Sequence, residues 1–247
     1  MIIEARKNGI VLKDVACLSL PLTLDCGEAF RWEEQTDGSW SGVAYGKYLN
    51  IKEENGIFIL KDTSLADFQA VWRRYFDLDR DYAAICEKLK EDELVRETID
   101  EYYGIRILNQ EPWEALVSFV ISQQNNIKRI KGIIKRLCDT YGREIRPGWH
   151  AFPGSETLSA LSAEALAGMG LGYRAKYVKK LADDVESGKI DLAKIKAMDL
   201  DDAKKALLSI YGVGEKVANC ALLFGFQFIR CLLYTSPSPR DPKTCRM

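Results

Sequence analysis

The 247-residue chain has the composition of an ordinary globular protein, with 47% hydrophobic residues, 29% charged residues and a net charge of −1. This balance excludes a uniformly basic nucleic-acid binder, so any surface for a polyanion must be local. The seven cysteines include no Cys-x-x-Cys pair, which favours free thiols in a reducing compartment over a disulfide framework, an iron–sulfur cluster or a zinc site. The start of the chain does not have the pattern of a signal peptide, and no apolar run approaches the roughly 18 residues of a membrane-spanning helix.

The first part of the chain predicts an antiparallel sheet followed by helices. β-Branched and aromatic runs alternate with Asp-Gly and Asn-Gly turn pairs. The expected strands are Phe30–Glu34, Trp40–Tyr45, Tyr48–Glu53 and Ile57–Lys61. Ser64 then begins a capping signature for a helix, and two further helical patterns follow at about 80–91 and 92–102. We therefore expect an α+β domain over residues 1–104.

From Pro112 onward the pattern is almost entirely helical. Pro112 suits the first turn of a helix, and Leu116–Ile121 is too apolar for a surface, which predicts the core of a second domain. The elements expected after the amides Gln123–Asn126 are a helix at 127–141, a loop at 142–154, a turn at 168–172 and a helix at 174–187. The fold class expected is α+β, with an antiparallel β-sheet domain followed by a mostly α-helical domain over residues 105–228.

Two runs of cations fall within this helical part. Five lie between residues 128 and 136 without an acid, and four more lie between residues 174 and 180. Such runs are usually solvated helix faces. Because they stand beside amide-rich and glycine-rich turns, they also suggest a local basic strip for a phosphate backbone.

The stretch Ile210–Ala218 predicts a tight Gly-x-Gly hairpin between two helices. Gly212 and Gly214 allow positive φ and close backbone approach, so amide groups at the start of the second helix can face a phosphate. Lys216 falls in the first turn of that helix, an unusual place for a cation. Its amine is a nucleophile only when neutral, and the helix dipole contributes at most about 2 kcal/mol toward that state. Burial or a proton acceptor is also needed. The alternative is a solvated lysine after a structural hairpin.

Four separated motifs carry a resemblance to a known family. They are Gly27–Trp32, Gln110–Phe119 continuing to Gln124–Arg129, Gly170–Lys176, and Tyr211–Ala218 with Cys220 following. Together they resemble the helix-hairpin-helix DNA glycosylases, specifically the 8-oxoguanine DNA glycosylase/AP lyases, over about residues 10–228. The resemblance implies a base-excision repair enzyme that uses no metal or cofactor and acts on double-stranded DNA containing oxidised guanine. A monomer in a prokaryotic cytoplasm, at the nucleoid and away from membranes, is expected.

The resemblance also implies roles in the base pocket. Lys216 would attack the sugar C1′, displace the oxidised base and form a Schiff base that permits strand cleavage by β-elimination. The carbonyl of Gly27 would accept the N7–H that 8-oxoguanine has and guanine lacks, and Cys220 would stack on the extruded base. The alternatives are a glycine in a β-turn and a small buried hydrophobic residue.

Other residues are expected to hold the DNA after base extrusion. Arg129 and Arg174 would donate to the orphaned cytosine, Tyr173 would wedge beside it, and Gln124 and Asn125 would fill the gap. The family usually has Asn where Gln124 stands, so selectivity for cytosine is open at this position.

The match to the family ends near residue 228. The family needs an aspartate about 19 residues after the lysine, but this chain has no acid between Glu215 and Asp241. Residues 229–247 resemble a translated adaptor sequence and are expected to be an unstructured, artefactual tail. We therefore expect a glycosylase impaired in catalysis.

Three other interpretations remain. One is a lesion-binding module without catalysis, which the missing aspartate makes plausible. Another is a sister glycosylase for alkylated purines, which the lysine after Gly-Val-Gly-Glu argues against. The last is a structural helix-hairpin-helix protein, which leaves the motif Gly27–Trp32 unexplained.

Overall fold

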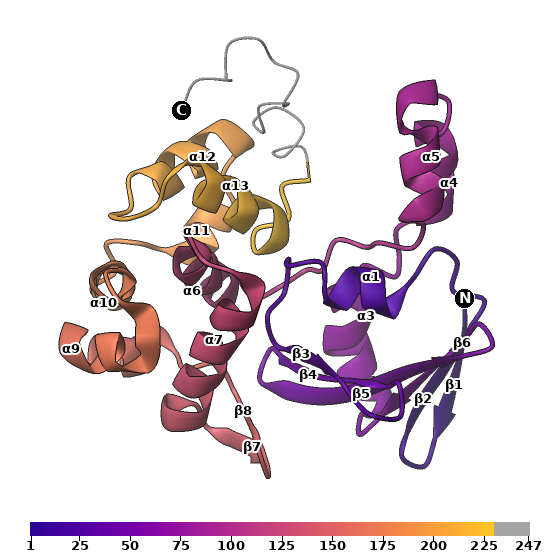
Figure 1. The fold of residues 1–247 in the computed structure, drawn as a ribbon, viewed down its shortest axis with the longest axis horizontal. Helices are drawn as coiled ribbons and strands as arrows, with labels where there is room; N and C mark the ends of the chain where they lie inside the picture. The colour runs from indigo at the N-terminus through magenta and orange to yellow at the C-terminus, as the bar shows by residue number, and fades with distance from the viewer. Residues whose placement is uncertain (230–247) are drawn as a thin grey trace.

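The computed structural model of the protein describes residues 1–229, so the predicted tail at 229–247 lies outside these residues except for its first residue. Two separate hydrophobic clusters define an N-terminal domain and a helical domain. Figure 1 shows the helical domain at the left and the N-terminal domain at the right, joined by the segment that precedes helix α6. The predicted α+β fold is confirmed.

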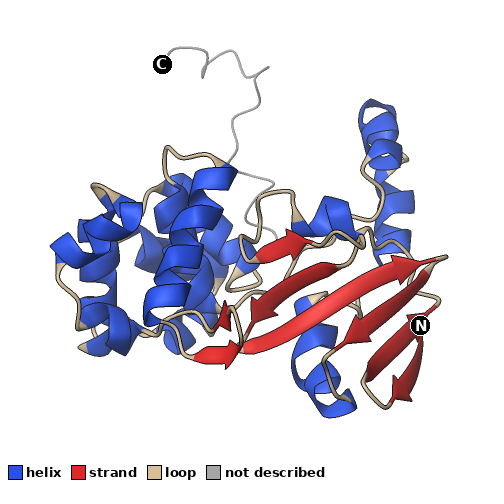
Figure 2. Cartoon of the chain, turned by 60° about the horizontal axis from the view of Figure 1, so that its bottom comes forward, coloured by secondary structure: helices blue, strands red, loops and turns tan. Residues whose placement is uncertain are grey.

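The N-terminal domain is built on one antiparallel six-stranded sheet of order β1-β2-β6-β5-β4-β3, seen in Figure 2 as the red layer. Its strands are β1 (Ile2–Arg6), β2 (Gly9–Lys13), β3 (Trp32–Glu34), β4 (Trp40–Ala44), β5 (Lys47–Glu54) and β6 (Ile57–Lys61). Two-residue turns join β4 to β5 and β5 to β6, and the second is the predicted Asn55-Gly56, where both residues have positive φ. The predicted strands are confirmed, although the first begins at Trp32 rather than Phe30.

Short helices pack on this sheet. They are α1 (Leu20–Leu24), α2 (Leu65–Asp67), the π-helical segment η1 (Phe68–Trp72) and α3 (Arg73–Tyr75). Ser64 caps α2 as predicted, because its hydroxyl accepts the Asp67 backbone N–H at 3.0 Å. Trp32 and Trp72 are fully buried between these helices and the sheet, and the Trp32 indole donates to the Tyr75 hydroxyl at 2.8 Å.

The helices α4 (Tyr82–Leu89) and α5 (Glu93–Glu101) form a hairpin that projects from the N-terminal domain (Figure 1). Tyr82 is the only residue of this hairpin that is fully buried. Few apolar groups therefore anchor the hairpin to the domain.

The helical domain is organised around α6 (Pro112–Ser122), whose Leu116 and Ile121 are completely buried. The surrounding helices are α7 (Ile127–Tyr141), α8 (Ser155–Ser159), α9 (Ala163–Leu166), α10 (Arg174–Glu186), α11 (Leu192–Lys196), α12 (Leu200–Leu208) and α13 (Glu215–Phe224). Within residues 1–229 no helix is long and apolar enough to cross a membrane.

Two local predictions in this domain need correction. The expected loop at 142–154 contains a small two-stranded sheet, β7 (Glu144–Arg146) and β8 (Trp149–His150). The expected turn at 168–172 overlaps the π-helical segment η2 (Ala167–Leu171), inside which Gly170 adopts a non-helical φ of 92°. Sequence patterns missed both because each depends on packing against α7.

Candidate active site

The predicted hairpin is present between α12 and α13, but its two glycines differ in backbone conformation and in the space around them. Gly212 has φ 85°, and a Cβ added to it would lie 2.3 Å from the ring of Tyr177, so only glycine fits. Gly214 has φ −98°, and nothing lies within 4 Å of the position of a Cβ. Gly214 therefore does not use the positive φ that glycine allows. It precedes α13 as an N-cap without a side-chain hydrogen bond, which leaves the amides of the first turn facing outward among the described residues.

Lys216 lies in the first turn of α13 and lines a cavity of about 400 Å³ at the junction of the two domains. Gly27 and Cys220 line the same cavity, so the structure brings together the three residues predicted for the base pocket. The lysine side chain is exposed. Its neighbour Glu215 is ion-paired with Lys204 at 2.7 Å, and this pair joins α12 to α13.

Aromatic side chains form the apolar wall of this cavity. Phe30 meets Phe119 edge-on with 5.9 Å between ring centroids, and Phe119 stacks on Phe224 at 5.5 Å. Cys220 is half-buried beside them, and burial raises the pKa of its thiol while the charge of Lys216 acts in the opposite direction. Phe119 and Phe224 lie in apolar helical runs, whose pattern predicts only a core and not a site.

The glycine side of the cavity also holds a buried acid. Gly27 has φ 89°, a conformation that side chains other than glycine rarely adopt, and a Cβ there would lie 3.2 Å from the side chain of Ile127. The adjacent Glu28 is buried, and its carboxylate accepts the Leu108 N–H at 3.4 Å. Burial raises the pKa of Glu28 to about 8, so the group is mostly neutral near pH 7. Sequence reasoning missed this acid because it read the segment only as a motif around Gly27.

Two of the predicted motifs meet at the domain junction. The Gln110 amide donates to the Glu28 carbonyl at 2.6 Å, and Arg31 pairs with Glu114 at 3.5 Å. Burial raises the pKa of Glu114 to about 7, although Arg31 opposes the shift. Through these contacts the motif beginning at Gly27 is held against the start of α6.

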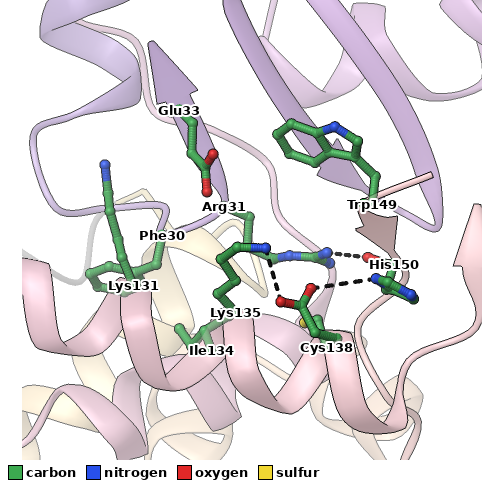
Figure 3. Close-up of a pocket in the computed structure, with 11 residues that line it drawn as sticks. Phe30, Arg31, Glu33, Lys131, Ile134, Lys135, Cys138, Trp149 and His150 are labelled. Atoms are coloured by element: carbon green, nitrogen blue, oxygen red, sulfur yellow. Dashed lines mark hydrogen bonds and ion pairs between the residues drawn. The ribbon is translucent and has the colours of Figure 1, made fainter. Parts of the chain in front are cut away.

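Figure 3 shows that the side chain of Arg31 also extends toward His150 on β8. Its guanidinium donates to the His150 carbonyl, and the ring of His150 lies 3.4 Å from Asp139 on α7, which also pairs with Lys135 at 2.9 Å. The space enclosed here is only about 40 Å³, enough for little more than a water molecule. These residues therefore join the domains rather than form a substrate cavity.

The predicted amide segment lies between α6 and α7 at the mouth of the site. Gln124 has φ 46°, and Asn125 lines the cavity together with Lys216. Arg174 is only 4% exposed, and its guanidinium donates to the backbone carbonyls of Gln123 at 2.8 Å and Gln124 at 3.0 Å. The Gln123 amide donates to the Gly212 carbonyl at 2.9 Å, which couples this segment to the hairpin. Sequence reasoning gave Gln123 no such role.

The other predicted DNA contacts are on the surface. Arg129 is exposed, and Tyr173 is 48% exposed with the Arg174 guanidinium 4.5 Å from its ring centroid. The two cationic runs are not uninterrupted positive strips, because several of their lysines have acidic partners. These pairs are Lys131–Asp25, Lys135–Asp139, Lys179–Asp183 and Lys180–Asp184.

A metal site was not predicted. In the described part of the chain, no group of three or more His, Cys, Asp or Glu side chains is placed to hold a metal ion.

Comparison with family models matches nearly the whole described chain. Residues 10–116 match the "8-oxoguanine DNA glycosylase, N-terminal domain", and residues 117–225 match the "HhH-GPD superfamily base excision DNA repair protein". Among characterised relatives, the N-glycosylase/DNA lyase of Saccharomyces cerevisiae is 32% identical over 84% of this chain. The N-glycosylase/DNA lyase OGG1 of Arabidopsis thaliana is 29% identical over 84% of it. The chain spans only 63% and 60% of the lengths of these two proteins.

Solved structures give the same result. MBOgg1, solved with a low-affinity DNA ligand, superposes with a TM-score of 0.88 and 39% identity over 92% of this chain and 80% of that one. The Clostridium acetobutylicum 8-oxoguanine glycosylase/lyase, solved with double-stranded DNA containing cytosine opposite 8-oxoG, gives a TM-score of 0.90 and 33% identity. That superposition covers 92% of this chain and 79% of the Clostridium chain.

Proposed function

Because the chain belongs to the 8-oxoguanine DNA glycosylase family, we propose that it excises 8-oxoguanine opposite cytosine and cleaves the DNA strand as an AP lyase. The observation that carries this proposal is the single cavity lined by Lys216, Gly27 and Cys220. A lysine, a glycine and a cysteine thus line one space at the start of α13. A base extruded from duplex DNA is held in such a pocket by hydrogen bonds and stacking.

The reaction follows from the position of Lys216. Its neutral amine attacks C1′ of the damaged nucleotide, the C1′–N9 bond breaks, and the oxidised base leaves with the bonding electrons. The sugar ring then opens to a Schiff base, and β-elimination expels the 3′ phosphate. The amine must first lose a proton. Because the carboxylate of Glu215 is ion-paired with Lys204, a different group has to accept that proton.

Base discrimination rests on Gly27. Its carbonyl accepts a hydrogen bond from the N7–H of 8-oxoguanine, whereas normal guanine presents a lone pair to the same oxygen. The phenylalanine wall and Cys220 provide the apolar stacking surface for the purine. The exposed Arg129 and Tyr173 face the partner strand, and the amides of Gln124 and Asn125 fill the position left by the base.

Catalysis by the printed chain is proposed to be weak, because the sequence has no acid between Glu215 and Asp241 to support the developing positive charge. A lesion-binding protein without catalysis is the second candidate, favoured by the same observation. In either case the partner is double-stranded DNA containing oxidised guanine. The protein is proposed to act on it as a monomer in a prokaryotic cytoplasm.

Borohydride trapping on a duplex with 8-oxoguanine opposite cytosine tests the proposal. We expect a covalent protein–DNA adduct that disappears in Lys216→Gln, while DNA affinity stays within about twofold. Lys205→Gln is the matched control, because Lys205 is an exposed lysine on the neighbouring helix α12. An adduct that survives in Lys216→Gln would rule out the assigned nucleophile. Lesion binding without any adduct would favour the second candidate.

A further inference from the structure

Two cysteine thiols face one another in the N-terminal domain, away from the cavity described above. The sulfur atoms of Cys17 and Cys86 are 3.6 Å apart. Cys17 lies in the loop between β2 and α1, and Cys86 lies on α4, so 69 residues separate them in sequence. Because the fold brings them together over this separation, their contact is tertiary rather than an accident of local spacing.

The distance is short enough for a covalent bond to form without rearranging the fold. A disulfide has a sulfur–sulfur distance of about 2.05 Å, so the two atoms have to approach by about 1.5 Å. Cys86 is in the middle of an exposed two-helix hairpin that few apolar contacts hold in place. A small movement of that hairpin supplies the approach.

We propose that Cys17 and Cys86 form a modification site at which a peroxide generates an intramolecular disulfide. One thiol loses its proton, its thiolate attacks the peroxide, and the O–O bond breaks to give a sulfenic acid and hydroxide, which takes up the released proton as water. The second thiol then attacks that sulfur, so the S–S bond forms, the S–O bond breaks, and a second water leaves. The two thiols lose two electrons in total, and hydrogen peroxide is reduced to two molecules of water.

The surroundings assign the order of these steps. Cys17 is 5% exposed, whereas Cys86 is half-buried and reachable from solvent. The thiolate of Cys86 therefore attacks the peroxide first, and the thiol of Cys17 then attacks the resulting sulfenic acid. Burial and the neighbouring Cys17 raise the pKa of Cys86 to about 11, while the nearby Lys90 acts in the opposite direction. Because little thiolate is present at neutral pH, the reaction is slow and responds to sustained oxidation.

The bond would join the projecting hairpin to the wall of the cavity. The Cys17 carbonyl accepts a hydrogen bond from Arg106 at 2.8 Å, and Arg106 stands between Ile105 and Ile107, which both line the cavity. In the reduced protein the hairpin is held near this segment by Tyr82, whose hydroxyl accepts the Ile107 N–H at 3.0 Å. A disulfide would add a covalent connection beside that hydrogen bond and close a long loop of the chain.

Peptide mapping after treatment of the full-length folded protein with hydrogen peroxide tests the proposal. Trypsin releases Cys17 in the peptide Asp14–Arg31 and Cys86 in the peptide Asp81–Lys88. We expect these peptides to be linked, at a combined mass two hydrogens below their sum, and to separate after treatment with dithiothreitol. Because Asp14–Arg31 also contains Cys26, the variant Cys26→Ser should retain the linkage, whereas Cys86→Ser should lose it.

A second measurement keeps the test independent of how well a variant folds. The oxidised wild-type protein should unfold at a temperature at least about 5 °C above that of the reduced protein, since a bridge across 69 residues restricts the unfolded chain. Cys86→Ser should show no such increase. Oxidation of Cys86 to a sulfinic acid without a linked peptide would overturn the proposal. A linkage that is lost in Cys26→Ser, or that forms only in urea, would also overturn it.

Discussion

The side-chain amide of Gln110 donates a hydrogen bond to the backbone carbonyl of Glu28 at 2.6 Å. This bond ties the loop that contains Gly27 to the segment entering the helical domain. Both partners are buried, so water cannot replace either one if the bond is lost. The position of the Gly27 carbonyl in the cavity depends on this contact.

Replacing Gln110 should therefore destabilise the domain junction. Gln110→Ala leaves the Glu28 carbonyl without its buried donor, and we expect a loss of roughly 1–3 kcal/mol in the free energy of unfolding. Urea titration measures this loss. The control Gln69→Ala removes an exposed amide and should cost less than about 0.5 kcal/mol. If the two substitutions lowered the free energy of unfolding equally, the Gln110–Glu28 bond would not be important for stability.

The two hairpin glycines should respond differently to alanine. Gly212→Ala places a methyl group against the Tyr177 ring at a positive φ, and we expect a cost of about 2–4 kcal/mol together with weakened DNA binding. Gly214→Ala meets no neighbouring atom and should cost less than about 1 kcal/mol. Thermal unfolding and binding to undamaged duplex DNA measure both effects. A Gly214→Ala protein as unstable as Gly212→Ala would contradict this distinction.

Replacing the two arginines predicted to contact the orphaned cytosine should have different effects, one on stability and the other on recognition of the opposite base. Arg174→Ala removes buried donors from the carbonyls of Gln123 and Gln124, and a cost of about 2–4 kcal/mol is expected. Arg129→Ala changes an exposed side chain and should leave stability within about 0.5 kcal/mol. It should instead reduce the preference for cytosine over adenine opposite the lesion. Unchanged opposite-base discrimination in Arg129→Ala would refute its assigned role.

Stability should fall as pH rises from about 5 to 8. Burial raises the pKa of Glu28 to about 8 in the folded protein, whereas an unfolded glutamate has its ordinary value near 4.3. Between these values the unfolded state has released the proton and the folded state still holds it, so rising pH favours unfolding. The contribution of the Glu28 proton to stability is fully present below the pKa of glutamate in the unfolded chain, and it is lost by about pH 8.

The amide variant isolates this effect. Glu28→Gln has no proton to release, so its free energy of unfolding should lose less between pH 5 and pH 8, by an amount of the order of a few kcal/mol. Glu93→Gln, at an exposed position on α5, should keep the wild-type slope. Denaturant unfolding at several pH values measures the slopes. Parallel curves for wild type and Glu28→Gln would exclude Glu28 as the source.

The sequence predicted the fold class and most of the regular elements, because their hydrophobic periods and turn residues are local signals. The helix-hairpin-helix turn and the strands after Trp32 are examples. It did not predict that Arg174 would be buried against backbone carbonyls, since an arginine in a cationic run has the same local pattern whether it faces solvent or the interior. The burial of Glu28 was not predicted either, because its local sequence pattern is the same whether it is buried or exposed. Its burial comes from Leu108 and the domain junction, which are distant in sequence.

The small sheet formed by β7 and β8 gives the two domains a second attachment. Tyr48 on β5 packs edge-on against Trp149 at 5.0 Å, and Arg146 pairs with Asp62 at 2.9 Å. Together with the junction formed by the Gln110–Glu28 bond and the Arg31–Glu114 pair, the domains are thus fastened in two separate regions. Bodies joined at two places can pivot only about the line between them. Free separation of the domains, which would move Gly27 away from Lys216, is accordingly opposed at both places.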